Sequence, residues 1–408
     1  MNRVVVTGIG AVTPIGNNVP EYWAALEAGV NGIDTISRFD ISESRFKMGA
    51  EVKGLDVATL LGKAAARKTD PFVQYALIAS QEAMNDSGLE GQIADEDLGV
   101  YYGTGIGGIQ TLCKEDQANL ENGANYVSPQ FVPKMIMNIA AGNIAIRFHA
   151  KGSSLALSTA CATGTTAIGE AYRAICHGYA KAIICGGSEA AIVPLTVAGF
   201  GNCMALSAAE DKNAASLPFD KRRGGFVIGE GAATLILEEY EHAKARGAKI
   251  YAEVCGYGAA CDAHHITAPD PEATCTIRAI RQAMQNMGDV PAETLYVNAH
   301  GTGTHLNDIT ETTAFKRAFG QDAYRLHISS TKSMTGHMLG AAGAAEAIAC
   351  LFTLKKGVVP PTINLLEPDE ECDLNYTPLK AVYTEIRGAI STSLGFGGHD
   401  TCIAFRTL

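Results

Sequence analysis

One cysteine occupies a sequence context that suits nucleophilic catalysis. Cys161 follows the apolar run Leu155–Thr159 and precedes the small-residue stretch Thr165–His177, a pattern that predicts a strand, a tight turn and a helix. A thiol at such a turn faces the positive end of the helix dipole, which lowers its pKa and favours the reactive thiolate. Cysteines are also among the most buried residues, so the residues alone leave a structural role for Cys161 equally open.

Two histidines lie at the ends of predicted elements, where active-site groups usually gather. His300 follows the strand-like run Tyr296–Ala299, and His337 ends the polar segment Ser329–Gly336. When a carboxylated thioester loses CO2, the enolate oxygen needs hydrogen-bond donors, and neutral imidazoles provide them. Backbone N–H groups of Gly395–Gly398 suit an oxyanion hole or a gate. This set suits a Claisen condensation; the alternative enzyme, a cysteine hydrolase, would need one histidine and a group that orients it.

Three other motifs have weaker functional interpretations. Gly103–Gly108 matches the dinucleotide pattern G-x-G-x-x-G, but no strand ending in an acidic residue follows about 20 residues later, so nucleotide binding is disfavoured. Lys221–Arg223 is a basic triplet that suits either a solvated loop or a docking site. A possible zinc cluster consists of Cys255, Cys261, His264 and His265. It lacks the usual C-x-x-C pairing, and we expect no bound metal.

Composition limits the partners of the chain. The 408 residues carry a net charge of −11, which disfavours nucleic acid, although an acidic protein can still bind a local basic patch. The 11 cysteines are odd in number and scattered, which is typical of free thiols in a reducing compartment. The start, Met1–Gly8, resembles a buried strand and not a signal peptide, and no apolar run is long enough to span a bilayer. We therefore expect a cytoplasmic protein without membrane or nucleic-acid partners.

The order of predicted elements indicates an α/β protein with buried, mixed sheets. Strands are expected at Val4–Thr7, Leu98–Tyr102, Leu155–Thr159, Ala182–Cys185, Thr234–Leu237, Leu295–Asn298 and Thr401–Phe405. Helices are expected at Glu21–Glu27, Phe72–Met84, Thr165–His177, Pro271–Met287, Ile309–Phe319 and Ala341–Lys356. The charged segment Glu238–Gly247 is predicted to be a helix at the seam between two halves, residues 1–247 and 248–408.

Several motifs in one order make the chain resemble the elongating β-ketoacyl-[acyl-carrier-protein] synthases, most closely synthase II. These motifs are Val4–Pro14, Ser128–Pro133, Ser158–Gly164, Pro218–Ala232, Glu238–Glu253, Asn298–Thr304, Ser329–Ile348 and Pro360–Leu365. The resemblance implies the thiolase fold, in which two similar halves form five α/β/α/β/α layers. It also implies fatty-acid chain elongation, or, as the alternative, the ketosynthase subunit of a type II polyketide or polyene pathway.

The resemblance also assigns roles to residues. Cys161 would hold the acyl chain as a thioester, His300 and His337 would promote malonyl decarboxylation, and Lys332 with Glu346 would complete the active site. The backbone N–H groups of Cys161 and Phe396 would form the oxyanion hole, and Phe396 would also serve as a mobile gate. Substrate-binding positions implied by the family are Ile106, Phe200, Thr302, Thr304, Gly395 and Gly397. No cofactor is implied, because phosphopantetheine of the carrier protein holds both substrates.

The resemblance implies an acyl carrier protein as partner, and a homodimer or a heterodimer with a chain-length-factor-like subunit. Some positions depart from the family pattern: His399-Asp400 replaces Thr-Asn, Met204 replaces arginine, and Asn125-Tyr126 replaces a basic pair. These changes predict a pathway-specific carrier. The expected docking residues are Lys63, Arg67, Lys68, Arg222 and Arg223.

Overall fold

A sheet of ten strands runs through the molecule in a computed structural model that describes residues 1–408. Its strand order is β10-β9-β13-β14-β8-β1-β7-β6-β4-β5. The strands are β1 (Val4–Val12), β4 (Leu98–Gly103), β5 (Ser154–Leu157), β6 (Ala182–Glu189), β7 (Gly231–Glu239), β8 (Ala252–Cys261), β9 (Leu295–Asn298), β10 (His327–Ser329), β13 (Gly388–Gly395) and β14 (His399–Arg406). Two small sheets pair β2 (Asp34–Thr35) with β3 (Met48–Gly49) and β11 (Val358–Val359) with β12 (Val382–Tyr383).

The two ends of this sheet repeat one topology. In the first, β1 is antiparallel to β7 and β7 to β6, while β6 and β5 each lie parallel to β4. In the second, β8, β14, β13, β9 and β10 repeat these relations in the same order. The halves join where Val4–Val6 pairs with Ala252–Val254. The predicted seam at residues 247 and 248 falls between α10 (Tyr240–Ala245) and β8.

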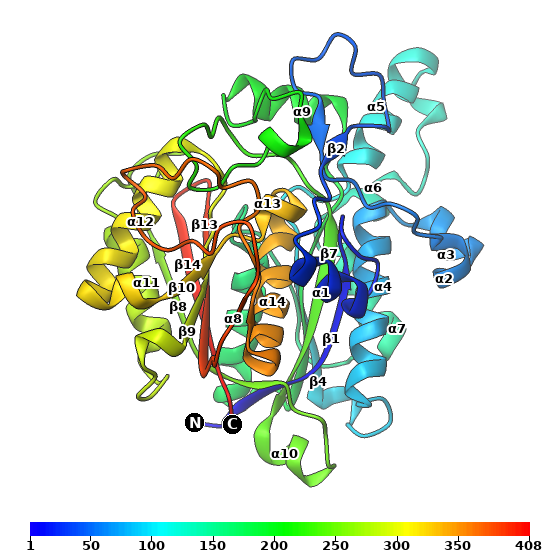
Figure 1. Cartoon of the computed structure of the whole chain (residues 1–408). Coiled ribbons are helices and arrows are strands. Elements are labelled where there is room, and N and C mark those ends of the chain that lie inside the picture. Colours follow the sequence, from blue (N-terminus) through cyan, green and yellow to red (C-terminus); the bar gives the residue numbers. More distant parts are fainter.

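Helices form layers on and between the two half-sheets. In Figure 1, α8 and α14 lie in the centre and contact strands of both halves, α4 and α7 cover one outer face, and α11 and α12 lie at the other. The longer helices are α1 (Val19–Ala28), α4 (Pro71–Ser87), α5 (Ile109–Asn122), α7 (Ile139–Phe148), α8 (Thr163–Cys176), α9 (Pro194–Asn202), α11 (Thr274–Met284), α12 (His305–Phe319) and α14 (Ala342–Lys356). Short helices are α2 (Val57–Leu61), α3 (Lys63–Lys68), α6 (Phe131–Met135) and α13 (Lys332–Thr335). The α/β/α/β/α order confirms the expected thiolase-like fold.

Close contact between the central helices explains their small residues. A Cβ added at Gly164 of α8 would lie 2.7 Å from the backbone N of Ala344 in α14. A Cβ added at Gly343 would lie 2.1 Å from Oγ1 of Thr165. Because backbone occupies the space a side chain would take, the N-terminal ends of α8 and α14 meet directly, and the residues that precede them meet as well.

Every predicted strand and helix segment overlaps an observed element of the same type. The segment Glu238–Gly247 is only partly helical, because Glu238 and Glu239 end β7 before α10 begins. Strands β8, β10 and β13 were not among the predicted strands. None of the helices is both long and apolar enough to cross a membrane.

Candidate active site

The turn that carries Cys161 is tightly fixed. It joins β5 to α8, with Ala160 in the left-handed region at φ 50°. The Thr163 hydroxyl donates to the Ala160 carbonyl (2.7 Å) and accepts from the Thr159 N–H (2.9 Å). Gly395 presses on this turn, since an added Cβ would lie 2.6 Å from the Thr159 carbonyl oxygen and 3.3 Å from the Cys161 nitrogen. The predicted strand–turn–helix is confirmed, and only glycine fits at position 395.

The prediction of a lowered thiol pKa is wrong for the substrate-free enzyme. Burial raises the pKa of Cys161 to about 12, and the charge of Glu189 adds to this increase. The charge of Lys332 and the N–H groups of Phe396 and Cys161 act in the opposite direction. Desolvation therefore outweighs the helix start, and the resting group is a thiol.

His300 and His337 come together from separate loops. Their ring centroids lie 5.3 Å apart, with the ring planes at 85°. Both residues are held through their backbones: the N–H of His300 donates to Glu311 (2.6 Å), and that of His337 to the Val227 carbonyl (2.7 Å). The structure therefore places both imidazoles at one site, as the sequence predicted.

Both imidazoles are neutral. Burial and the nearby charge of Lys332 hold the pKa of His300 and of His337 well below the ordinary value. Nδ1 of each ring is buried without a partner. A buried acceptor tolerates this better than a buried N–H, so the proton is assigned to Nε2. This is the state that can stabilise an oxyanion.

The expected pair Lys332 and Glu346 is present behind the imidazoles. Lys332 donates to Glu346, and both side chains are buried, at 1% and 2% exposed. Burial raises the pKa of Glu346, and the ammonium of Lys332 counters that increase. The pair therefore places a cation near the thiol and both imidazoles without exposing it to solvent.

A cavity of about 320 Å³ brings most of the predicted residues together. The predicted residues that line it are Cys161, Phe200, His300, Thr302, Thr304, His337, Gly395 and Phe396. Phe396 lies beside Phe200, with ring centroids 6.4 Å apart. The Thr302 and Thr304 hydroxyls lie 2.9 Å apart. One cavity therefore contains the predicted thiol, both predicted imidazoles and both predicted aromatic rings.

Sequence reasoning missed several residues of this site. Phe226 lines the cavity, and the centroids of its ring and of the His337 ring lie 5.1 Å apart. Asn307 and Asp400 also line the cavity. Glu311 accepts from the N–H groups of His300 and Gly301. A glutamate in the helix that follows a Gly/Thr loop was a signal that could have identified Glu311.

Two predicted substrate-binding positions do not line the cavity. Ile106 packs in the same apolar cluster as Cys161 and Phe396. Gly397 is exposed, and its N–H donates to the Ile266 carbonyl (2.7 Å), so that group is not free for a substrate. The dinucleotide motif is also accounted for, because the N–H groups of Gly105 and Ile106 donate to Glu189 and cannot bind a phosphate.

The predicted docking residues fall into two classes. Lys63, Arg67 and Lys68 are exposed on α3 and make no ion pair. Lys134, not predicted, donates to the backbone carbonyl of Arg67 and extends this patch. Arg223 is a correction, because it is buried and its guanidinium pairs with Asp369 (2.6 Å).

Arg222, a second member of the predicted basic triplet, is only partly available for docking. Its guanidinium pairs with Asp220 (2.8 Å) and its side chain is 36% exposed. Basic residues next to one another in sequence therefore have different surroundings, and the α3 patch is the free one.

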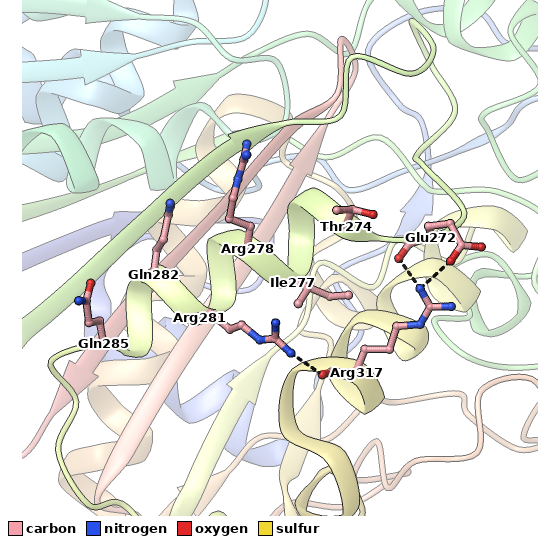
Figure 2. A pocket seen from close by; sticks show the side chains of 8 residues that line it. All are labelled: Glu272, Thr274, Ile277, Arg278, Arg281, Gln282, Gln285 and Arg317. Carbon is pink, nitrogen blue, oxygen red and sulfur yellow. Dashed lines mark hydrogen bonds and ion pairs between the residues drawn. The ribbon is translucent and has the colours of Figure 1, made fainter.

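A second groove, of about 600 Å³, lies on the outer face along α11 and is not a candidate for this chemistry. Figure 2 shows Arg278, Arg281 and Arg317 around it, with Arg317 bonded to Glu272. It contains no thiol or imidazole. No three His, Cys, Asp or Glu side chains are grouped so that they could hold a metal ion, and Cys255 of the suspected cluster is buried in β8.

Two family models match the chain. Residues 1–243 match "Beta-ketoacyl synthase, N-terminal domain", and residues 251–366 match "Beta-ketoacyl synthase, C-terminal domain". The chain is 50% identical over 406 residues to a 3-oxoacyl-[acyl-carrier-protein] synthase 2 of Synechocystis sp., covering 99% of this chain and 98% of that protein. It is 46% identical over 398 residues to the protein of that name from Coxiella burnetii, covering 97% and 96%.

Solved structures are similar over the whole chain. The ishigamide ketosynthase/chain length factor matches with a TM-score of 0.93 at 34% identity, covering 100% of this chain and 99% of that chain. A type II polyketide ketosynthase bound to the hexaketide, in complex with its acyl-carrier protein, matches with a TM-score of 0.90 at 34% identity and the same coverage of 100% and 99%.

Proposed function

The chain belongs to the β-ketoacyl synthase family, and from that premise we propose how its own residues extend a carrier-bound acyl chain by two carbons. The chain is a β-ketoacyl-[acyl-carrier-protein] synthase, an acyltransferase of chain elongation. The observation that carries the residue roles is the cavity in which one buried thiol faces two neutral imidazoles.

In the first half-reaction, the sulfur of Cys161 attacks the thioester carbonyl of the acyl carrier. The developing oxyanion accepts hydrogen bonds from the N–H groups of Cys161 and Phe396. The close approach of Gly395 to the Cys161 nitrogen, 3.3 Å from an added Cβ, supports this role. The carbon–sulfur bond to pantetheine breaks, and the departing sulfur takes the thiol proton. The acyl chain is then a thioester on Cys161, next to the apolar cluster that contains Ile106 and Phe200.

In the second half-reaction, malonyl thioester occupies the same cavity and loses CO2. The Nε2–H groups of His300 and His337 donate to the enolate oxygen, which needs no proton transfer because both rings are neutral. The enolate carbon attacks the acyl carbonyl, and the Cys161 sulfur leaves. We propose that Lys332, held by Glu346, supplies the positive charge that favours this thiolate. One proton from solvent returns the Cys161 thiolate to the resting thiol. Every other bond change uses only the protein and the two thioesters, so the proposal includes no cofactor and no metal.

The carrier protein and its docking site belong to this proposal. Lys63, Arg67, Lys68 and Lys134 form a basic patch on an otherwise acidic chain, which suits an acidic carrier. The similar ketosynthase complexed with its acyl-carrier protein supports such a partner. Pantetheine would enter beside Thr302 and Thr304, which line the cavity.

We propose fatty-acid elongation as the pathway, because the curated relatives at 45–50% identity are 3-oxoacyl-[acyl-carrier-protein] synthases 2. A type II polyketide pathway is the second candidate. It is favoured by the similar polyketide ketosynthases and by Met204, which is 89% exposed where a basic docking residue was expected.

A dimer is proposed from the open edge of the sheet. Strand β5 forms one edge of the ten-stranded sheet, and its Leu155 is 43% exposed. Helix α7 contacts β5, and Ile146 of α7 is 77% exposed. Open edges and apolar side chains attract a further strand. We propose β5–β5 pairing in a homodimer, with a chain-length-factor-like subunit as the other occupant. Light scattering distinguishes a dimer from a 42.8 kDa monomer, and mass spectrometry identifies the second subunit.

The proposed location is the cytoplasm. All of the cysteines are free thiols, and most of them are buried. Exposed Cys203 and Cys261 would be prone to oxidation in an oxidising compartment.

The acyl-enzyme tests the proposal directly. After incubation with an acyl carrier protein and proteolysis, mass spectrometry should find the acyl group on Cys161. Cys203 lines the same cavity and is exposed, so Cys203→Ala is the matched control and should retain the adduct. An adduct on Cys203, or none on Cys161, would contradict the assigned nucleophile.

A further inference from the structure

Glu189 is a buried carboxylate that the reaction steps above do not use. It ends β6 and is 0% exposed, and each of its hydrogen-bond donors is an uncharged group. One oxygen accepts from the Thr104 hydroxyl (2.9 Å) and the Ile106 N–H (3.1 Å). The other accepts from the N–H groups of Gly105 (2.7 Å) and Gly340 (3.0 Å). Four donors thus converge on one side chain.

These donors come from loops of different halves. Residues 104–106 follow β4 in the first half, whereas Gly340 lies three residues after His337 in the second. The loops touch, since a Cβ added at Gly340 would lie 2.5 Å from the Gly105 nitrogen and 2.9 Å from the Glu189 carboxylate. A Cβ added at Gly105 would lie 2.7 Å from the same oxygen. Glycine at both positions is therefore required for the carboxylate to bridge the loops.

The bridged loops carry apolar side chains that pack in the cluster containing the thiol. Ile106 and Leu339 pack in one cluster with Cys161 and Phe396. Leu339 has φ 47°, a strained conformation for a leucine, and the adjacent Gly340 N–H is bonded to Glu189. Fixing these backbone N–H groups therefore fixes two loops whose apolar side chains belong to the cluster that contains Cys161.

The surroundings of Glu189 also define its charge. All four neighbours are donors, so the ionised carboxylate fits and a protonated one would point its O–H at a donor. Burial raises the pKa of Glu189, and the four hydrogen bonds oppose that increase. The charge acts on Cys161 against that of Lys332, while His300 and His337 are neutral.

We propose that Glu189 is a positioning residue that fastens the loop after β4 to the loop after His337, and thereby holds Ile106 and Leu339 in place around Cys161 as the acyl pocket. Its role in catalysis rests on the proposed function, since an acyl pocket presupposes an acyl-enzyme. A second consequence does not. A Cβ added at Gly105 would lie 2.7 Å from the Glu189 carboxylate and 3.6 Å from the Ala160 carbonyl oxygen, so the anion lies next to the turn that carries Cys161 and disfavours a thiolate there.

Glu189→Gln tests both consequences. The amide NH2 would face a donor, so the loops should separate and the KM for long acyl carriers should rise on the order of tenfold, more than the KM for malonyl carrier. Without any thioester, alkylation of Cys161 by iodoacetamide should shift to lower pH and accelerate by roughly severalfold, because removal of an anion increases the thiolate fraction. Unchanged chain-length preference together with an unchanged alkylation profile would overturn the proposal.

Glu311→Gln is the matched control. It removes a similar buried carboxylate, which accepts from His300, Gly301 and Thr392 of the second half and from neither of the loops that Glu189 joins. It should slow malonyl decarboxylation through His300 and leave the alkylation profile in place. If this variant shifts alkylation equally, the effect is general destabilisation and the proposal is wrong.

Thr104 gives a milder test should Glu189→Gln fail to fold. Thr104→Val removes one of the four donors and should raise the KM for long acyl carriers a few-fold, whereas Thr104→Ser keeps the hydroxyl and should match the unmodified enzyme. Equal KM values in both variants would overturn the proposal. Absence of an acyl adduct on Cys161 would instead overturn the proposed function, and the alkylation result would still stand.

Discussion

The two halves of the molecule share a topology but carry different chemistry. Strand β5 in the first half corresponds to β10 in the second, since each is the outer strand parallel to its neighbour. After β5, a short turn presents Cys161 before α8. After β10, a longer polar segment brings Lys332 and His337 before α14. The first half therefore supplies the nucleophile, and the second supplies donors and a cation.

Corresponding loops show the same contrast. The loops after β4 and β9 both give backbone N–H groups to a buried glutamate, Glu189 in the first half and Glu311 in the second. Only the second loop also carries a reactive side chain, His300. The difference teaches that the shared sheet fixes loop positions, while the side chains at strand ends decide which half-reaction each half serves.

Loss of the nucleophile should give the largest difference between the two half-reactions. Cys161→Ala should lower condensation by roughly a thousandfold or more, because no acyl-enzyme forms. Decarboxylation of malonyl carrier should continue, since both imidazoles of the second half remain in place. The measurement is CO2 release from labelled malonyl carrier beside product formation. Simultaneous loss of both activities would break the division between the halves.

Loss of one imidazole should have the reverse effect. His337→Ala should lower decarboxylation on the order of a hundredfold, as expected for one lost oxyanion donor. Transfer of the acyl group to Cys161 should stay within about tenfold, because its oxyanion is bound by backbone N–H groups. His305→Ala, at an exposed histidine that also lines the cavity, is the control and should alter neither step strongly. Equal losses in the two half-reactions would contradict the assigned roles.

The sequence predicted the strands that consist of branched apolar runs, such as β1 and β6. It did not predict β13, where Ser391 and Ser393 are buried without forming an apolar run, or β10, which has three residues. Helix α5 lacks a clear hydrophobic stripe, because only Thr111 of its residues is buried. Strands β10 and β13 depend on pairing with β9, which is distant in sequence, and local composition does not encode such pairing. Helix α5 packs mainly against segments close to it in sequence, such as α6.

The site was predicted as far as its motifs extend. Cys161, His300 and His337 are identified by their places at strand ends, but the thiol pKa depends on burial, which reversed the helix-dipole prediction. Arg223 has the sequence context of a surface loop, yet its partner Asp369 is 146 residues away in the chain. Distant partners of this kind are not readable from one sequence.

The two halves also differ in how a buried acid at the start of equivalent strands affects the pH dependence of folding stability. Glu230, just before β7, pairs with Arg38, whereas Asp400, near the start of β14, faces Asp262 and Glu311. Burial and then Asp262 raise the pKa of Asp400 from the ordinary 3.8 to about 8. The folded state thus binds this proton more tightly than the unfolded state does, and stability should fall as pH rises between those values.

Asp400→Asn tests this difference. It should increase stability above pH 8 and flatten the pH dependence, which is up to about 1.4 kcal/mol per pH unit for one proton. Urea unfolding at pH 6 and 9 measures the change, with exposed Asp322→Asn as the control. If both variants show the pH dependence of the unmodified protein, the Asp400–Asp262 contact is not the source of it.

The smallest effect is expected at the surface of the first half, where α3 carries the free basic patch. The net charge of −11 gives no long-range attraction for an acidic carrier, so docking must rely on local contacts. Exposed ion pairs are individually weak, and reversal of Arg67 and Lys68 to Glu should raise the carrier KM only a few-fold to about tenfold. The effect should shrink as salt increases, and Cys161 should alkylate at its normal rate because the patch does not touch the cavity. Reversal of Lys355 and Lys356 to Glu makes the same charge change at the far end of α14 and should leave the KM in place. If the carrier KM is insensitive to the α3 reversal and to salt, docking does not use this patch, and the surface contribution of the first half to the reaction is refuted.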